Sequence, residues 1–281
     1  MEVEIMRRIL SAVLAGVMCF SLAACSDGGN TATKEGKVTL AAKTSTMSAE
    51  LTEKYASEYG FEVVYYEDSP TMYQAVINGT NAACFEDRSV IGWAINKEDL
   101  PLKTAGDIEN AAFYGFAVKK GTNEELIKMF NAGLANIKAS GKYDEILDKY
   151  GYGGEKKYKD ESAARVDSGV TPSKKYIIYS DNAFAPFEFL DTATNTYTGV
   201  DMDILAAVAK DQGFEYEVKN EGFDASMGAV QSGQADGMIA GMTITDERKQ
   251  TYDFSDGYFE DGQILVVPAD SSVTSVADLK K

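Results

Sequence analysis

The segment 241–248 combines residue types that suit the capture of a carboxylate. Gly241 lets the backbone approach a ligand closely, and Thr243 offers hydrogen-bond donors from its hydroxyl and its amide. The guanidinium of Arg248 is a planar fork that can bind a carboxylate through two parallel hydrogen bonds. The segment also suits the start of a helix, with Thr245 as N-cap and two acidic residues near the positive end of the helix dipole. The residues by themselves leave both interpretations open.

The composition argues against several other kinds of site. The 281 residues include 44 acidic and 27 basic side chains, for a formal net charge of −17, so a nucleic acid would be repelled. Histidine is absent, which removes Ser-His-Asp catalysis and argues against zinc. Cys84 fits a buried strand, because no histidine could act as the base of a catalytic thiol. We therefore predict no catalytic residue, no metal and no cofactor.

The first 25 residues have the pattern of an export signal. Two arginines precede an apolar run at 9–20, which is too short for a membrane span, and small residues follow. The ending Leu-Ala-Ala-Cys resembles a bacterial lipobox. This resemblance implies that Cys25 becomes the lipid-modified first residue of a mature protein held on the outer side of the cell membrane. Acidic residues before the arginines leave both Met1 and Met6 open as the true start.

Strand and helix patterns alternate along the chain in two units, which predicts an α/β fold with parallel or mixed sheets. In the first unit we expect strands at 38–42, 61–66, 82–85 and 111–118, and helices at 48–59, capped by Ser48, and at 71–77, 123–140 and 143–150. In the second unit we expect strands at 176–179, 214–218, 236–240 and 263–267, and helices at 201–212 and 223–231. Residues 26–35 suit a tether and 151–173 a linker, because both are polar and contain small residues or Gly and Pro.

Both units resemble the bacterial extracellular solute-binding proteins of family 3, which bind polar amino acids for ABC importers. The second unit resembles the first lobe of the family through residues 179–189, 198–203, 231–236, 241–248 and 253–258. The first unit resembles the family's second lobe through residues 36–48 and 85–87 and its terminal helices through 131–134, 141–146 and 149–151. The resemblance implies a two-lobed fold of the type II periplasmic-binding-protein class with two hinge strands.

The two units stand in the reverse of the family's usual order. Joining residue 281 to residue 36 would restore one uninterrupted family sequence, which suggests a circular permutation, with hinge strands at 111–118 and 263–267. A linker of about 20 residues spans roughly 65 Å when extended, enough for ends that often lie close together. A piece of a tandem-repeat gene is the alternative. The permutation predicts a monomer with these parts: signal peptide and lipobox 1–25, tether 26–35, second lobe 36–111 with 268–281, hinge strand and C-terminal helices 112–150, linker 151–173, and first lobe with hinge strand 174–267.

Carried over residue by residue, the resemblance implies a site for a free α-amino acid. The expected contacts are Arg248, Thr243, Thr46 and Met47 for the carboxylate, Asp87 and the carbonyl of Gly241 for the ammonium, Phe184 and Phe223 for the aliphatic stem, and Asp181, Lys43 and Glu86 for the side chain. Each also has an ordinary structural interpretation: an acidic N-cap for Asp87, core packing for the aromatics, and surface charge for the last three.

The side-chain contacts favour glutamine and then a basic amino acid. An acceptor such as Asp181 and a cationic donor such as Lys43 together suit an amide. Glu86 could neutralise Lys43, or it could select a basic ligand together with Asp181. The implied function is capture of a polar L-amino acid outside the membrane for the permease subunits of an ABC importer. The alternatives are an enzyme of the dehydratase or cell-wall lyase type, with Asp181 and Glu86 as acid and base, and a ligand-sensing domain.

Overall fold

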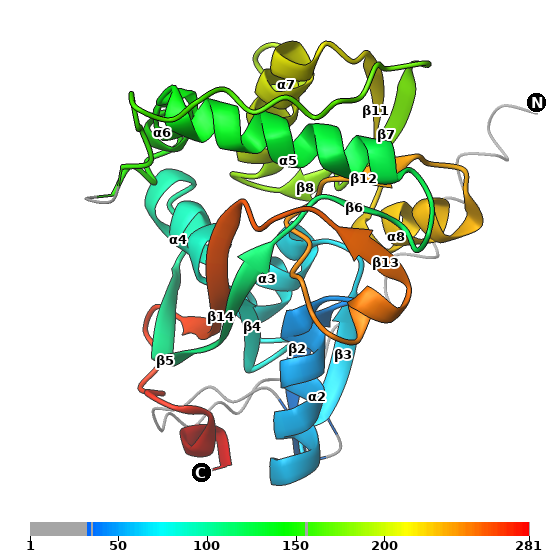
Figure 1. Ribbon diagram of the computed structural model, residues 1–281. Coiled ribbons are helices and arrows are strands. Elements are labelled where there is room, and N and C mark those ends of the chain that lie inside the picture. The colour runs from blue at the N-terminus through cyan, green and yellow to red at the C-terminus, as the bar shows by residue number, and fades with distance from the viewer. Residues whose placement is uncertain (1–32, 35, 155–156, 281) are drawn as a thin grey trace, which may run out of the picture.

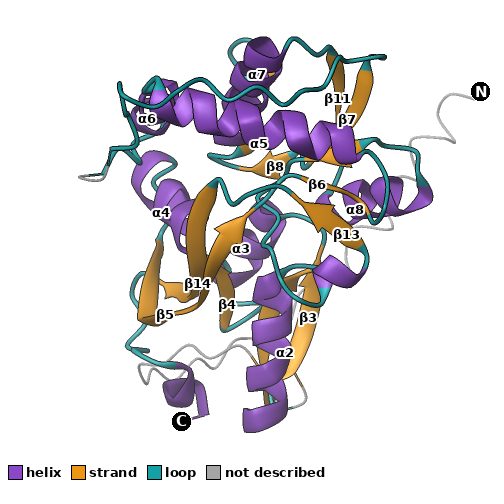
Figure 2. Ribbon diagram, in the orientation of Figure 1, coloured by secondary structure: helices purple, strands orange, loops and turns teal. Residues whose placement is uncertain are grey.

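The computed structural model of the chain describes residues 33–34, 36–154 and 157–280 (Figure 1). The expected signal peptide, Cys25 and most of the tether lie outside the described residues. Within the described part, no helix is both long enough and apolar enough to cross a membrane. The helices and strands form two lobes, one above the other in the view of Figure 2. The α/β class and the two-lobed arrangement expected from the sequence are confirmed.

The six-stranded lobe comprises residues 33–34, 36–114 and 259–280. Its strands are β1 (Thr33–Lys34), β2 (Lys37–Lys43), β3 (Glu62–Tyr66), β4 (Ala83–Asp87), β5 (Leu102–Tyr114) and β14 (Phe259–Pro268). Its helices are α2 (Met47–Tyr59), α3 (Ser69–Ile77), α4 (Arg88–Lys97) and the short 3-10 helix η2 (Val276–Lys280). Strand β2 is parallel to β3 and β4, whereas β14 is antiparallel to β4 and β5, so the sheet is mixed.

The N-cap of helix α2 lies two residues earlier than the sequence suggested. Thr46 is its N-cap, because the Thr46 hydroxyl accepts a hydrogen bond from the amide of Ala49 at 3.2 Å. The same hydroxyl donates to the carbonyl of Lys43 at 2.7 Å, which fixes the turn between β2 and the helix. The prediction that Ser48 caps this helix was therefore wrong. Gly60 ends the helix in the left-handed conformation that glycine adopts without strain.

The five-stranded lobe comprises residues 115–154 and 157–258. Its main sheet has the order β11 (Tyr216–Asn220), β7 (Tyr176–Ser180), β12 (Gly237–Met238), β6 (Ala117–Lys119) and β13 (Tyr252–Phe254). A smaller sheet contains β8 (Ala183–Phe184), β9 (Glu188–Asp191) and β10 (Thr196–Thr198). The helices are α5 (Glu124–Ala139), α6 (Lys142–Lys149), α7 (Val200–Gln212), α8 (Phe223–Ser232) and the 3-10 helix η1 (Arg248–Gln250).

The largest apolar cluster of the described residues lies mainly in the five-stranded lobe and includes buried side chains of α5, α6, α7 and β7. It continues into the six-stranded lobe through Val90, Tyr114 and Phe259. Helices α5 and α7 lie close together because Gly133 of α5 faces Val208 of α7. A Cβ atom on Gly133 would lie 2.8 Å from a methyl carbon of Val208, so a larger residue would push the helices apart. This packing provides a rigid base for the strand ends that face the other lobe.

The chain passes between the lobes twice in the described residues. The first crossing runs from β5 through Gly115 and Phe116 to β6, within the expected hinge strand 111–118. The second crossing runs through residues 255–258 between β13 and β14. The other expected hinge segment, 263–267, lies beyond this crossing in β14, where it pairs with β4 and β5. Two connections of a few residues each allow the lobes to move as separate bodies.

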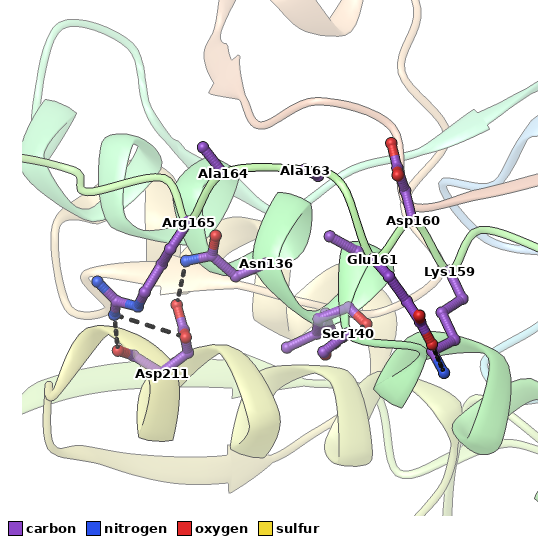
Figure 3. A pocket seen from close by; sticks show the side chains of 11 residues that line it. Asn136, Ser140, Lys159, Asp160, Glu161, Ala163, Ala164, Arg165 and Asp211 are labelled. Atoms are coloured by element: carbon purple, nitrogen blue, oxygen red, sulfur yellow. Dashed lines mark hydrogen bonds and ion pairs between the residues drawn. The ribbon is translucent and has the colours of Figure 1, made fainter.

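The linker after α6 lies against the helices of the five-stranded lobe (Figure 1). Asn136 of α5 donates to the carbonyl of Val166 at 2.9 Å and accepts from the Val166 amide at 2.7 Å. Arg165 donates to the backbone carbonyl of Asp211 at the end of α7, at 2.8 Å. Figure 3 shows Arg165 and Asn136 both reaching Asp211 beside a surface groove of about 470 Å³. The linker is thus attached to α5 and α7 by specific hydrogen bonds.

Candidate ligand-binding site

One cavity between the lobes gathers all the residues expected from the sequence except Glu86. The six-stranded lobe contributes Lys43, Thr46, Met47 and Asp87, and the five-stranded lobe contributes Asp181, Phe184, Phe223, Gly241, Thr243 and Arg248, together with Ala240. The cavity measures about 10 Å³, which is room for about one water molecule. The side chains of the two lobes therefore nearly fill the space between them, and an amino acid fits only if the lobes separate.

Arg248 lines this cavity and is only 7% exposed. Its guanidinium donates to the carbonyl of Thr243 and, across the cavity, to the carbonyl of Ser45, each at 3.0 Å. The hydroxyl of Thr245 accepts from the Arg248 amide at 3.1 Å, but the N-cap of η1 is Glu247 and not Thr245. Burial lowers the pKa of Arg248, and the charges of nearby acids oppose this shift. Arg248 therefore both lines the cavity and begins the short helix η1, whereas the prediction that Thr245 is the N-cap was wrong.

The N-terminus of α2 faces Arg248 from the other lobe. The N-cap Thr46 and the first helical residue Met47 both line the cavity. Amides in the first turn of a helix have no partner within the helix and carry partial positive charge, so they favour an anion. The guanidinium and the helix terminus together make one end of the cavity electropositive. This arrangement suits a carboxylate held by both lobes.

Asp87 also lines the cavity and does not cap the helix that follows it. It occupies the N-cap position of α4 but makes no side-chain capping hydrogen bond. Its Oδ1 atom instead accepts from Nε2 of Gln263 at 2.8 Å. Burial raises the pKa of Asp87 well above its ordinary value, and the charges of Asp261 and Glu86 raise it further. Asp87 is therefore an acceptor suited to a cation.

Gly241 is held in position by a buried carboxylate. Its amide donates to Oδ2 of Asp201 at 2.8 Å, and the hydroxyl of Tyr258 donates to the same oxygen at 2.7 Å. Its φ of +53° lies in the left-handed region, and a Cβ atom here would lie 2.6 Å from the ring of Phe184. Glycine is required for both reasons. Burial raises the pKa of Asp201 to about 6, although the bonds from Gly241 and Tyr258 oppose this shift.

Lys43 and Asp181 form an ion pair that joins the lobes at the end of two strands. The Nζ of Lys43 lies 2.5 Å from Oδ2 of Asp181, and the two side chains are only 2% and 1% exposed. Lys43 is the last residue of β2, and Asp181 directly follows β7. Burial by itself would lower the pKa of Lys43, but Asp181 raises it above the ordinary value. The ammonium also lies 4.7 Å from the ring centre of Phe184 and 5.9 Å from that of Phe223.

Glu86 points into its own lobe instead of lining the cavity. Its Oε2 accepts from the hydroxyls of Ser69 at 2.8 Å and Tyr73 at 2.7 Å, and its Oε1 accepts from the Asp87 amide at 2.9 Å. Within the described residues it makes no ion pair with Lys43, although its charge helps to raise the pKa of that lysine. Glu86 therefore acts on the site through its charge and through its bond to the Asp87 amide, without lining the cavity.

Sequence reasoning missed three residues that support the site: Asp201, Asp261 and Gln263. Asp201 lay within a segment that resembled the family, but no role was given to it. Asp261 and Gln263 are polar residues in β14, which is otherwise mostly buried and apolar. Charged or amide groups in a buried strand need partners there, so this pattern could have identified both.

Comparisons with known proteins add evidence for the family. The sequence model for "Bacterial extracellular solute-binding proteins, family 3" matches residues 2–153 and 176–279. The chain is 46% identical over 112 residues to a protein named "Probable histidine-binding protein" of Neisseria gonorrhoeae, covering 40% of this chain and 41% of that protein. It is 36% identical over 115 residues to the arginine-binding extracellular protein ArtP of Bacillus subtilis (strain 168), covering 41% and 44%.

A third relative is the glutamine-binding protein of Geobacillus stearothermophilus, which is 39% identical over 99 residues, covering 34% of this chain and 37% of that protein. The chain spans less than half the length of each of these relatives. The family match, by contrast, extends over most of the chain in two blocks. The chain therefore belongs to the bacterial extracellular solute-binding proteins of family 3.

Proposed function

We propose that this chain captures a polar L-amino acid outside the cell membrane and delivers it to the permease subunits of an ABC importer. The observation that carries this proposal is the arrangement of charge in the cavity between the lobes. Arg248 and the N-terminus of α2 suit a carboxylate, whereas Asp87 and the Gly241 carbonyl suit an ammonium. Both lobes contribute to both ends, so a bound amino acid would hold them together.

The ion pair between Lys43 and Asp181 supports glutamine as the preferred ligand. A ligand side chain that enters here must replace the hydrogen bond between the two groups. A glutamine amide can accept from Lys43 and donate to Asp181, so neither buried charge loses its partner. A basic side chain can pair with Asp181 but leaves the Lys43 ammonium facing a second cation, which places basic amino acids after glutamine. The names of the relatives include both glutamine and arginine binding.

The geometry does not favour an acid and base pair of the kind that a hydrolytic or eliminating enzyme needs. Asp181 is paired with Lys43, and Glu86 is turned away from the cavity toward Ser69 and Tyr73. Two carboxyl groups that act on one substrate must both reach it. The relatives named in the comparison are binding proteins, which also supports capture without reaction.

The first test is a screen of the twenty L-amino acids by thermal shift, followed by calorimetry. A ligand that binds only the folded protein raises its melting temperature, so glutamine is expected to give the largest increase. Basic amino acids are expected to follow. D-glutamine is the matched control, because it carries the same groups in the wrong arrangement. A folded protein that gives no shift and no heat with any of the twenty would contradict the proposed function.

We also propose that the chain is a circular permutation that closes within one molecule. The linker supports this, because it lies along α5 and α7 and joins α6 to β7 inside the five-stranded lobe. The same calorimetry decides the question when the molar mass is measured by light scattering. One ligand per chain in a monomer is expected, whereas a dimer that forms its cavities from two chains would indicate a tandem fragment or a domain swap.

We further propose that Cys25 anchors the protein to the outer side of the cell membrane. The support is the sequence Leu-Ala-Ala-Cys after a short apolar run. Mass spectrometry of the membrane fraction is expected to find Cys25 acylated and N-terminal. Cys25→Ser is expected to move the protein to the soluble fraction or block its processing, whereas Cys84→Ser should leave its location unchanged. An unmodified chain cleaved elsewhere would contradict the anchor.

A further inference from the structure

Helix α4 begins directly after Asp87, yet its capping oxygen comes from Asp261 on a different strand. Oδ2 of Asp261 accepts from the amide of Ser89 at 2.9 Å, which is the bond that an N-cap side chain usually accepts. Asp87 occupies the N-cap position without making it, and its Oδ1 accepts from Gln263 instead. Because Asp261 satisfies the helix end, the carboxyl of Asp87 can line the cavity.

Several donors stabilise Asp261 as a carboxylate, although it is only 4% exposed. Besides the Ser89 amide, the amide of Gly262 donates to its Oδ1 at 2.9 Å, and Nε of Arg88 lies 3.6 Å from the same oxygen. Burial raises the pKa of Asp261, and these donors oppose the shift because they favour the ionised form. Its negative charge is therefore held near Asp87 by backbone groups that cannot move away.

Asp87 has fewer partners for a negative charge. It is 6% exposed, and among the described residues no lysine or arginine nitrogen lies within 4.0 Å of its carboxylate. The titratable groups around it are Glu86 on β4, Tyr114 on β5, Asp261 on β14, Arg88 on α4 and, more distantly, Arg248 of η1. Burial, then Asp261 and then Glu86 raise the pKa of Asp87, and Tyr114 and Gln263 oppose them. The Tyr114 hydroxyl itself donates to Oδ2 of Asp261 at 3.4 Å. Of the two carboxyl groups, Asp87 therefore has the weaker support for a negative charge.

We propose that Asp261 is a positioning residue of the ammonium site, which caps α4 in place of Asp87 and keeps Asp87 protonated until the ammonium of a ligand displaces that proton. The inference rests on the proposed function, in which an amino-acid ammonium binds at Asp87. In the exchange the carboxyl group of Asp87 releases one proton to solvent and gains one ammonium as its partner. The charge of the site is the same before and after, so a buried carboxylate is never left unpaired.

The affinity for the amino acid is then expected to depend on pH and to fall as the pH falls. The ligand binds the ionised form of Asp87, so its affinity is highest above the raised pKa of that group in the ligand-free chain. As the pH falls below this pKa, affinity is expected to fall up to tenfold per pH unit. Calorimetry from pH 8.5 to pH 5, in buffers with different ionisation enthalpies, reports both the affinity and the number of protons released.

The decisive variant is Asp261→Asn, which keeps an oxygen that can accept from the Ser89 amide but removes the charge. The midpoint of the affinity profile is expected to move down by about one pH unit, with less proton release near the original midpoint, while affinity at pH 8.5 stays within a few-fold. Glu260→Gln is the matched control, because it removes one charge from the adjacent, exposed position of the same strand. Its profile is expected to match that of the unmodified chain.

A carboxyl ¹³C NMR titration of the ligand-free chain separates this inference from the proposed function. We expect an aspartate signal with a raised midpoint that is lost in Asp87→Asn and shifted down in Asp261→Asn. If an amino acid binds but its affinity profile is the same in Asp261→Asn, the inference is overturned and the proposed function stands. If no amino acid binds, the proposed function fails, and an unchanged Asp87 midpoint in Asp261→Asn would overturn the inference as well.

Discussion

Replacing Arg248 with alanine is expected to weaken binding of the preferred amino acid by roughly 2–5 kcal/mol, the usual cost of removing one partner of a buried, hydrogen-bonded charge pair. The guanidinium is buried in the cavity and already reaches both lobes through Thr243 and Ser45. Its loss would leave the ligand carboxylate with Thr243 and the uncharged amides of the α2 terminus. The α-carboxylate is common to all amino acids, so affinity should fall for every ligand of the set. Calorimetry at one pH measures the effect.

Two further variants show whether the effect belongs to the guanidinium fork. Arg248→Lys keeps the positive charge but loses the bidentate geometry, so its affinity should lie between those of the unmodified chain and Arg248→Ala. Arg165→Ala removes an arginine that binds Asp211 on the surface of the five-stranded lobe, and its affinity should not change. If folded Arg248→Ala binds the amino acid with an unchanged dissociation constant, Arg248 does not hold the ligand. It then has only its structural role at the start of η1.

Gly199→Ala is expected to destabilise the fold by roughly 3–5 kcal/mol, at the upper end of the effects of single substitutions. Gly199 precedes α7 with a φ of +141°, a conformation that other residues rarely adopt. A Cβ atom would lie 1.9 Å from the carbonyl oxygen of Phe187. That oxygen accepts from the amide of Asp201 at 3.0 Å, so the clash cannot be relieved without disturbing the start of α7. Urea unfolding followed by circular dichroism measures the loss.

Gly213→Ala provides the control at the other end of the same helix. Gly213 is the C-cap of α7 with a φ of +74°, and no atom lies within 4 Å of the position that its Cβ would take. Only the left-handed conformation then costs energy, about 1–2 kcal/mol. If Gly199→Ala is as stable as Gly213→Ala, the backbone at residue 199 can relax. That result would contradict the clash that the structure shows there.

The sequence predicted several long elements well because their apolar residues recur at a regular period, but it missed α4 (Arg88–Lys97) and most of β5 (Leu102–Tyr114). Helix α5 shows the pattern most clearly, with buried Leu126, Phe130, Leu134 and Ile137 on one face. The three short strands β8, β9 and β10 contain too few residues for a period to appear, and we did not predict them. The cap of α2 was misplaced for another reason: Thr46 and Ser48 are both good caps, and the bond from Thr46 to the carbonyl of Lys43 decides between them.

The same limits explain what the sequence could and could not say about the site. The family resemblance identified the positions that line the cavity, but it placed both Glu86 and Asp87 in contact with the ligand. These residues are neighbours on strand β4, and side chains of successive strand residues point to opposite faces. Only one can therefore face the cavity directly. The role of Asp261 depends on its distance to Ser89, which is 172 positions away in the chain and has no local signal.

The linker is docked on α5 and α7, so its length affects the free energy of folding of one lobe and not the closure of the two lobes. Both ends of the linker, at α6 and β7, belong to the five-stranded lobe, and so do the helices that hold its middle. The entropy of closing this loop is therefore a term in the folding of one lobe and not in the closure of the two lobes. Each doubling of a flexible loop costs only about 0.6 kcal/mol, so the linker could vary greatly in length at little cost to stability. Selection for amino-acid affinity would leave its length almost unconstrained.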